Sequence, residues 1–485
     1  MEFSQFDDNR EFSLSKFESM LKTNSILFFD SNEFENIIHH YLENGKIALA
    51  KKAIKLSLEQ HPDSTNLKLF KIEVYIFENK LQKANQLLDS LYALEPQNEE
   101  IFIQKANILS KQDQHQEAIN ILLKAIEFSK ETPDLYSLIG MEYLFLDKFE
   151  EAKINFMKCL EIDLEDYSAL YNVVYCFDFL EQTTEAIEYL TVYLDKNPYC
   201  EVAWHQLGKQ YVAQNDYQKA LAAFDFAIIS DDTFIGAYLE KGKVLEKISH
   251  HDKAVECYKI TLALEDPTSF ALLRIGHCYE KLQKNDMALQ YFYKTVEEDP
   301  LLDKAWIAIT KFYNKIHDYQ NALHYINKAI NIDGDNVVYW KLFAQINQRL
   351  NFLEEAERGY KKTLELGNYE LNTWISRGDI LIQLGEYEAA MFNFEQCHEF
   401  YPESEEVEFR LAGVNLMTHN TKKGIAHLRK GLNLNYDHYF IIEELFPSIY
   451  QRSYVTKIIK KCILINLKLN LLFIKVSNIA IIITY

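Results

Sequence analysis

The chain has 485 residues, 48% of them hydrophobic and 25% charged, an ordinary balance for a folded protein with a large core. Its formal net charge of −21 argues against nucleic acid as a general partner. Only 14 glycines and 8 prolines occur, too few for long flexible linkers, so we expect one continuous structural unit.

Residues 1–30 form the first segment. Its acidic opening lacks the basic start and apolar run of a signal peptide, which favours a cytoplasmic location. The stretch EFSLSKFESMLKT predicts a short amphipathic helix with Phe12, Phe17, Met20 and Leu21 on one face. We expect this helix to cover the apolar side of the unit that follows.

A small residue then recurs every 34 residues, without insertion or deletion. The positions are Ala50, Ala84, Ala118, Ala152, Ala186, Ala220, Ala254, Ala288, Ala322, Ala356, Ala390 and Gly424. A fixed period of this length indicates a helix–turn–helix unit stacked many times. In register, the units begin at Ser31, Thr65, Glu99, Pro133, Tyr167, Glu201, Ile235, Ser269, Asp303, Val337, Leu371 and Glu405. The sequence therefore predicts an all-α solenoid of twelve units over residues 31–438.

Each unit predicts two amphipathic helices joined by a polar turn. In the sixth unit, apolar or small residues at helical spacing are Trp204, Leu207, Gly208 and Tyr211, then Tyr217, Ala220, Phe224 and Ala227. Small residues at positions 8 and 20 of the unit allow two helices to approach closely, and position 24 is always large and apolar. Proline at position 32 ends the second helix, as at Pro198. The four tryptophans share position 4, so we interpret them as structural.

This pattern resembles the tetratricopeptide repeat family, whose signature of Trp, Leu-Gly, Tyr, Ala, Phe, Ala and Pro occurs here at the family's spacing. Ile38 and Ile72 stand where a small residue is usual and predict slightly wider helix pairs. In the twelfth repeat, Glu408, Asn415 and Gly424 depart from the pattern and predict a polar end unit. The resemblance implies a right-handed superhelix whose concave surface, lined by the first helix of each repeat, grips peptides or extended protein segments.

By this resemblance, positions 2, 5, 9, 12 and 13 of each repeat line the concave surface. In repeats one to five they include the acidic residues Glu35, Glu43, Glu73, Glu100, Asp134 and Asp178, against Lys111. In repeats six to ten they form a basic stripe of Lys209, Lys243, Lys247, Lys281, Lys304, Lys311, Lys315, Lys341 and Arg349. Repeats four and five add an apolar patch of Met141, Leu144, Phe145, Tyr171, Tyr175 and Phe179.

The stripe and the patch together predict a groove for an extended protein segment with acidic residues and an apolar anchor, since a cleft lined by one sign of charge focuses its field on the ligand. Two plainer interpretations remain open. The lysines could form a solvated helix face, and the apolar residues could pack against a neighbouring helix.

After Glu444 the chain has no acidic residue. Residues 439–451 predict a partial capping helix, and residues 452–485 form a tail rich in Ile, Leu, Lys and Asn. Lys475 and Asn478 interrupt its apolar run, which disfavours a transmembrane helix. Three origins stay open for the tail: translation in a shifted reading frame, a final capping helix, or a membrane anchor.

No catalytic, cofactor or metal-binding motif stands out in the sequence. The seven cysteines are scattered singly and predict packing thiols in a reducing compartment. The adjacent pairs His39–His40 and His250–His251 point in different directions on a helix and so make poor chelators. We expect a non-catalytic, cofactor-free scaffold that binds protein segments, with neither nucleic acid nor membrane as a partner. The alternative is a regulatory or substrate-docking arm of a separate enzyme or secretion complex.

Overall fold

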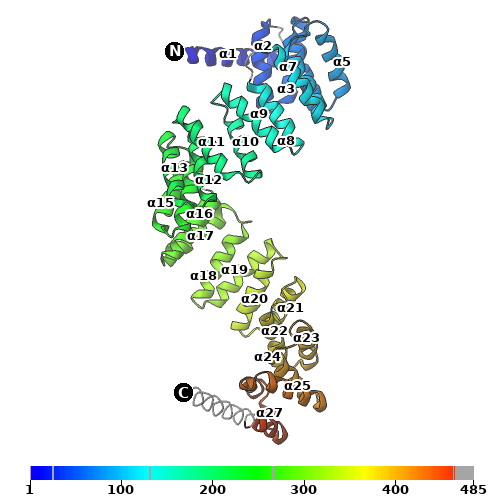
Figure 1. Cartoon of the computed structure of the whole chain (residues 1–485), viewed down its shortest axis with the longest axis vertical. Helices are drawn as coiled ribbons and strands as arrows, with labels where there is room; N and C mark the ends of the chain where they lie inside the picture. Colours follow the sequence, from blue (N-terminus) through cyan, green and yellow to red (C-terminus); the bar gives the residue numbers. More distant parts are fainter. Residues whose placement is uncertain (1, 24–26, 130–132, 265–267, 463, 465–485) are drawn as a thin grey trace, which may run out of the picture. The chain divides into compact units, whose positions relative to one another are not determined.

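The computed structural model describes residues 2–23, 27–129, 133–264, 268–462 and 464, with side chains from Ser13 onward. Every regular element among these residues is a helix (Figure 1). The helices are α1 (Glu2–Thr23), α2 (Ser31–Glu43), α3 (Ile47–Gln60), α4 (Thr65–Phe77), α5 (Leu81–Tyr92), α6 (Glu99–Ser110), α7 (His115–Phe128), α8 (Pro133–Phe145), α9 (Phe149–Ile162), α10 (Tyr167–Phe179), α11 (Thr183–Lys196), α12 (Glu201–Ala213), α13 (Tyr217–Ser230), α14 (Ile235–Lys247), α15 (His251–Leu264), α16 (Ser269–Lys281), α17 (Asn285–Glu298), α18 (Asp303–Lys315), α19 (Tyr319–Ile332), α20 (Val337–Arg349), α21 (Leu353–Glu365), α22 (Leu371–Gln383), α23 (Tyr387–Phe400), α24 (Glu405–Met417), α25 (Thr421–Leu434), a 3₁₀ turn η1 (Tyr436–Tyr439), α26 (Phe440–Leu445) and α27 (Pro447–Tyr450).

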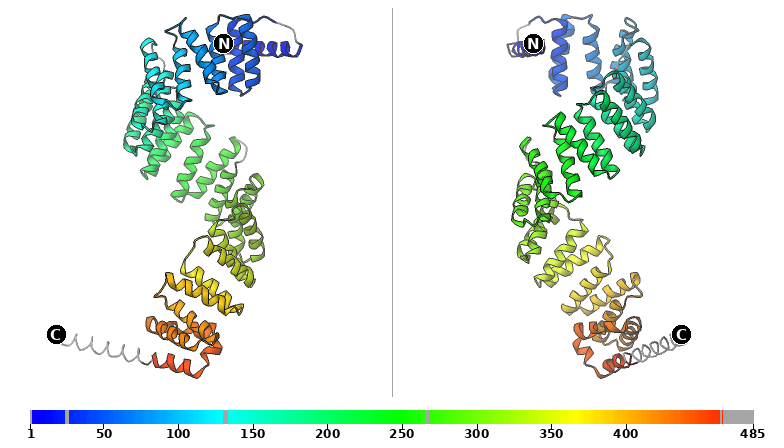
Figure 2. Two further views of the ribbon diagram at one scale, coloured as in Figure 1. Left: turned by 90° about the vertical axis from the view of Figure 1, so that its right-hand side faces the viewer. Right: turned by 60° about the vertical axis from the view of Figure 1, so that its left-hand side comes forward.

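Within each of the two compact units described below, consecutive helices pair and stack in chain order, as α12 does with α13 and α24 with α25. The first helix of each pair begins at the residue where the 34-residue register places a unit, for example Glu201 for α12 and Glu405 for α24. The predicted all-α solenoid of stacked helix pairs is confirmed. The chain divides into two compact units, an N-terminal unit (Met1–Val244) and a C-terminal unit (Leu245–Tyr485). Within each unit, neighbouring helices pack on one another (Figure 2).

The turn between the two helices of a pair has one fixed conformation. Its central residue, at position 15 of the repeat, has a positive φ in every pair, from Gly45 at 66° to His419 at 61°. The amide of the next residue donates back to the first helix, as Asp216 N does to the Tyr211 carbonyl at 2.9 Å. This bond closes the turn and fixes where the second helix starts.

Glycine at position 8 makes room for an aromatic ring at position 24 of the same repeat. A Cβ added at Gly140 would lie 2.7 Å from the Phe156 ring, and one added at Gly208 would lie closer still to the Phe224 ring. Both rings are fully buried. The sequence analysis expected the small residue to let two helices approach closely, whereas its nearest neighbour in the structure is this ring.

The tryptophans at position 4 tie each repeat to the end of the preceding one. The indole nitrogen of Trp204 donates to the Pro198 carbonyl at 2.8 Å, and Trp306 and Trp340 make the equivalent bonds to the preceding position 32 at 2.9 and 2.8 Å. Trp374 is buried and stacks with Tyr369 and Phe400. These contacts account for the tryptophans as structural residues.

The twelfth repeat is not a polar end unit, contrary to the sequence prediction. Glu408 and Asn415 are 0% and 1% exposed. Glu408 lies 2.7 Å from His427 and 2.6 Å from Lys430. Burial alone would raise the pKa of Glu408, but these two partners outweigh burial and lower it. The polar residues at these positions serve an internal network, because further helices cover the repeat.

The cover consists of α26, α27 and a helix at residues 453–462. Ile442, Phe446 and Ile449 are buried on α24 and α25, and so are Val455 and Ile459 of the last helix. The packed structure thus extends beyond residue 452, where the sequence placed the start of the anomalous tail. Residues 463 and 465–485 lie outside the described residues.

At the other end, α1 places Phe17 and Met20 in a buried cluster with Phe29, Phe34 and Tyr41 of the first repeat region. The Phe12 side chain lies outside the description. Among the described residues, the helices are all too short or too polar to cross a bilayer.

Candidate protein-binding surface

The candidate surface is formed by the first helices of successive pairs. In the N-terminal unit, α4 contacts both α2 and α6, and α10 contacts α12. These first helices lie side by side, so residues at one repeat position form a row across α2, α4 and α6 and across α10 and α12 (Figure 2). Positions 9 and 13 of one helix are also four residues apart and share a face.

The predicted apolar patch lies on α8 and α10, and its five outer members are exposed. Met141, Phe145, Tyr171, Tyr175 and Phe179 are between 37% and 59% exposed. Leu144 differs, since it is half-buried and packs against the core. The interpretation of these residues as packing residues therefore holds for Leu144 and not for the other five.

Two aromatic residues that the sequence analysis missed complete this patch. Phe149 stacks on Phe179 with ring centroids 3.7 Å apart, and His115 stacks on Phe145 at 5.0 Å. Both residues occupy position 17, at the start of a second helix, and each meets position 13 of the following repeat. The sequence pattern that could have indicated these contacts is an aromatic residue at position 17 of one repeat together with an aromatic residue at position 13 of the following repeat.

In the N-terminal unit, the basic stripe is represented by Lys209 and Lys243. Lys209 is exposed, whereas Lys243 is half-buried and lies 2.7 Å from Glu240. Both lysines lie near His205. The pKa of His205 is lowered to about 4, mainly by burial and in addition by the two lysine charges, against the opposing effect of Glu240. The structure thus brings Lys209 and Lys243 around one side chain.

In the C-terminal unit, the exposed members of the stripe are Lys247, Lys281, Lys304, Lys311, Lys315 and Arg349. Glu280 lies among them. A hydrogen bond from His277 lowers the pKa of Glu280, and the charges of Lys315 and Lys281 add to that effect. Lys281 of α16 and Lys315 of α18 therefore act on one carboxylate, which brings two successive first helices of the stripe together.

Lys341 departs from the predicted stripe. It is half-buried and lies 2.6 Å from Glu370 of the following turn, so its charge is already paired. Glu246, an acidic residue within the stripe, is also paired, because Arg274 makes two hydrogen bonds to its carboxylate at 2.8 and 2.7 Å. The ion pair with Arg274 compensates the negative charge of Glu246 within the stripe, and the ion pair with Glu370 compensates the positive charge of Lys341.

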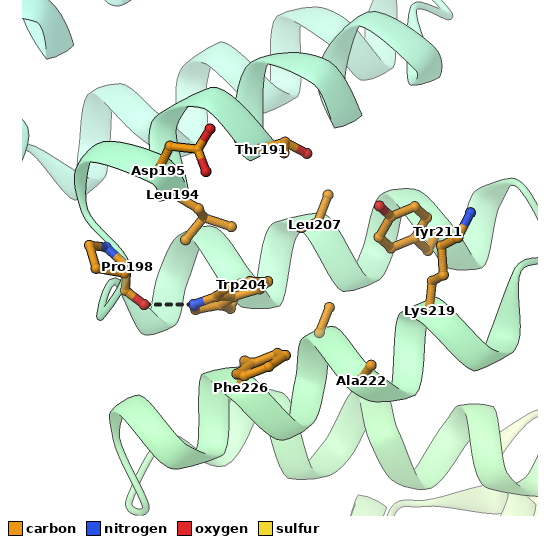
Figure 3. Close-up of a pocket in the computed structure, with 11 residues that line it drawn as sticks. Thr191, Leu194, Asp195, Pro198, Trp204, Leu207, Tyr211, Lys219, Ala222 and Phe226 are labelled. Atoms are coloured by element: carbon orange, nitrogen blue, oxygen red, sulfur yellow. Dashed lines mark hydrogen bonds between the residues drawn. The ribbon is translucent and has the colours of Figure 1, made fainter.

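A separate pocket of about 540 Å³ opens between α11, α12 and α13 (Figure 3). Trp204 lines this pocket and stacks on Phe226 with ring centroids 4.7 Å apart, and the small residues Thr191 and Ala222 also line it. Its lining residues include none from the stripe or the patch. The repeat register does not predict this pocket, since its small residues occupy positions with no fixed residue type.

Models of the tetratricopeptide repeat match residues 78–141, 133–166, 271–300 and 371–404. The chain therefore carries tetratricopeptide repeats in these segments.

Two curated relatives match shorter stretches. Anaphase-promoting complex subunit 3 of Schizosaccharomyces pombe is 27% identical over 146 residues, 30% of this chain and 22% of the relative. A UDP-N-acetylglucosamine–peptide N-acetylglucosaminyltransferase of Giardia intestinalis is 31% identical over 98 residues, 20% of this chain and 7% of the relative. The matches thus span less than a quarter of either relative.

Solved structures with similar helix pairs include the hetero-tetramer Cut9–Hcn1 of the anaphase-promoting complex, with 14% identity and a TM-score of 0.32. That match covers 87% of this chain and 97% of the other. The C-terminal part of a repeat protein from Cytophaga hutchinsonii has 15% identity and a TM-score of 0.42, and covers 49% and 98% of the two chains.

Proposed function

We propose that this chain, which carries tetratricopeptide repeats, is a non-catalytic scaffold that binds extended, acidic protein segments with an apolar anchor. The observation that carries the proposal is the exposure of large aromatic side chains on the first helices, with Phe145, Tyr175 and Phe179 more than half exposed. Exposed apolar residues that lie together mark interaction sites. We extend the repeat assignment to all twelve 34-residue units, which the matching helix starts support.

The basic stripe supports an acidic partner. Lys281, Lys311 and Lys315 are exposed in a chain whose net charge is −21, so they reverse the sign of the background. A local positive row speeds association with an acidic segment and makes binding sensitive to salt, because exposed charges are screened over about 8 Å at physiological ionic strength.

We also assign the protein to the cytoplasm. Cys159, Cys176 and Cys200 are buried and form no disulfide within the described residues, which supports a reducing compartment.

The test is a selection of random dodecapeptides on the full chain. We expect the selected peptides to combine aspartate or glutamate with an aromatic residue. Replacing Lys281, Lys311 and Lys315 together by glutamate should weaken their binding at least about tenfold, since each lost charge contact is worth on the order of 0.5–1 kcal/mol.

The matched control reverses three exposed lysines on second helices, Lys253, Lys328 and Lys361. This variant has the same net charge and should bind within about twofold of the wild type. Equal losses in both variants would mean that only net charge matters, and would contradict a binding groove on the first helices.

A second candidate is a docking arm within a larger enzyme or assembly. The stretch similar to anaphase-promoting complex subunit 3 favours this candidate, because that relative is by name a subunit of a complex. Size-exclusion chromatography of the native protein from its source distinguishes the two, since a stable subunit elutes at the size of an assembly and a transient scaffold elutes alone.

A further inference from the structure

The first three repeats contain a second feature on the same kind of helix face, with the opposite charge. A pocket of about 350 Å³ opens on α2, α4 and α6. Its polar lining consists of Glu35, Asn66, Glu73, Glu100 and Gln104, and its apolar lining consists of Leu69 and Phe70. The volume lies at the small end of the range for ligand pockets, about 300–1,000 Å³, and suits a single side chain.

The pocket has more hydrogen-bond acceptors than donors. Its two amide groups already donate to its carboxylates, Asn66 to Glu35 at 3.3 Å and Gln104 to Glu100 at 2.7 Å. Among the described residues, no lysine or arginine lies within ion-pair distance of Glu35, Glu73 or Glu100. The lining therefore presents negative charge without a resident cation.

Gln104 gives the independent indication of a ligand. Its side chain is only 6% exposed, and its Oε1 atom has no hydrogen-bond donor within the described structure. The amide orientation is fixed, because an ionised Glu100 can only accept and must face the nitrogen of Gln104. Leaving a buried acceptor without a donor costs on the order of 1–3 kcal/mol, so a donor from outside would stabilise the site.

The electrostatics point the same way. Burial raises the pKa of Glu73, and the neighbouring Glu100 charge raises it further, against a smaller opposing effect of His39. Two carboxylates that disfavour each other's ionisation form a site where a cation is attracted. A metal ion fits less well, since no group of His, Cys, Asp or Glu in the described part of the chain has the arrangement to hold one.

We propose that this pocket binds an arginine side chain of a partner segment. A guanidinium carries five donors in a planar fork and can serve Glu73 and Glu100 together, with a donor left for the Gln104 oxygen once that buried side chain turns toward the pocket, whereas an ammonium is a point charge. The aliphatic stem of the arginine packs on Leu69 and Phe70. The inference rests on the proposal that first-helix surfaces bind protein segments, and it adds a basic residue to what the N-terminal repeats recognise.

The test uses the full chain and two blocked hexapeptides, Ala-Ala-Arg-Ala-Ala-Ser and the same peptide with citrulline in place of arginine. Citrulline keeps the shape and removes the charge. By titration at low salt, the arginine peptide should bind at least about tenfold more tightly than the citrulline peptide, because hydrogen bonds to charged groups are the stronger ones.

The variant Glu73→Gln with Glu100→Gln should abolish this preference. The control removes two exposed glutamates of α7, Glu117→Gln with Glu127→Gln, and should keep it. Equal binding of both peptides to the wild type, or equal loss in the control, would overturn the inference. Because the wild-type comparison needs no variant, a folding defect cannot obscure it. If acidic peptides bind the basic stripe while the arginine peptide fails, the pocket assignment falls and the proposed function stands.

Discussion

At the scale of single residues, positions 8 and 24 of a repeat share one space. Where position 24 is phenylalanine, as at Phe156 and Phe224, position 8 is glycine. Where position 8 is isoleucine, at Ile38 and Ile72, position 24 is aliphatic and both isoleucines are fully buried. The sequence predicted wider helix pairs at these isoleucines. In the structure, the larger side chain at position 8 is compensated by a smaller side chain at position 24. The repeat period alone could not indicate this compensation, because it does not say which positions are in contact.

This exchange predicts a rescue. Gly208→Ala places a methyl group against the Phe224 ring and should lower the free energy of unfolding by about 1–3 kcal/mol. Adding Phe224→Leu should recover part of that loss, although Phe224→Leu alone destabilises. Urea unfolding of the two single variants and the double variant measures the coupling. Strict additivity of the two changes would show that the residues do not share a space.

His205 predicts a pH dependence. It lies between the Phe224 and Phe234 rings, its pKa falls to about 4, and neither ring nitrogen has a hydrogen-bond partner in the described structure. An unfolded histidine titrates near 6.5, so the unfolded chain binds more protons between pH 6.5 and 4. The contribution of neutral His205 is therefore complete above pH 6.5 and is lost as pH falls.

Between pH 7 and pH 5, this residue should cost about 2 kcal/mol of stability, at about 1.4 kcal/mol for each pH unit below 6.5. His205→Phe should remove that part of the acid sensitivity. Urea melts of both proteins at the two pH values provide the measurement. An unchanged pH dependence in the variant would refute the assignment to His205.

At the scale of elements, helix boundaries, pairing and a polar turn followed from the sequence, which also predicted a capping helix at residues 439–451. The conformation of the turn and the extension of the cover beyond residue 452 did not follow from it. Position 15 carries residues as different as Glu181, Gln283 and His317, all with positive φ. Such residue types give no turn signal on their own, because the packed helices on either side impose the conformation. The polar residues of repeat twelve were misread for a related reason. A polar residue type indicates an exposed side chain only when no hydrogen-bond partner lies nearby in the fold, and Glu408 has such a partner in His427.

The cover predicts a role for the start of the tail. Ile459 is 2% exposed and packs on the last repeats, so Ile459→Ala should lower the free energy of unfolding of the C-terminal unit by about 2–4 kcal/mol. Exposed Lys457 on the same helix is the control, and Lys457→Ala should change it by less than about 0.5 kcal/mol. Chemical unfolding of both variants decides the matter. An Ile459→Ala protein as stable as the control would mean that this helix does not cover the repeats.

At the scale of the whole molecule, the sequence could place charged and aromatic rows on the first helices because the repeat register assigns each residue a position. It could not show which charges remain available. Lys341 pairs with Glu370 from the following turn, and Arg274 neutralises Glu246 from the next helix pair. These partners lie outside the positions that the resemblance assigns to the concave surface. The sequence could also not predict that the Gln104 side-chain oxygen lacks a hydrogen-bond donor, since this depends on the contacts of neighbouring helices.

The central claim is that partner segments bind on the first helices. Photo-crosslinking tests it directly, with benzoylphenylalanine at Phe179 or Lys315 on first helices and at Val192 or Ile229 on second helices. All four side chains are exposed, so access to solvent does not distinguish them. With a peptide selected on the full chain, we predict crosslinks from Phe179 and Lys315 that unlabelled peptide competes away, and background yield from Val192 and Ile229. Specific crosslinks from Val192 and Ile229, with none from Phe179 and Lys315, would contradict the account.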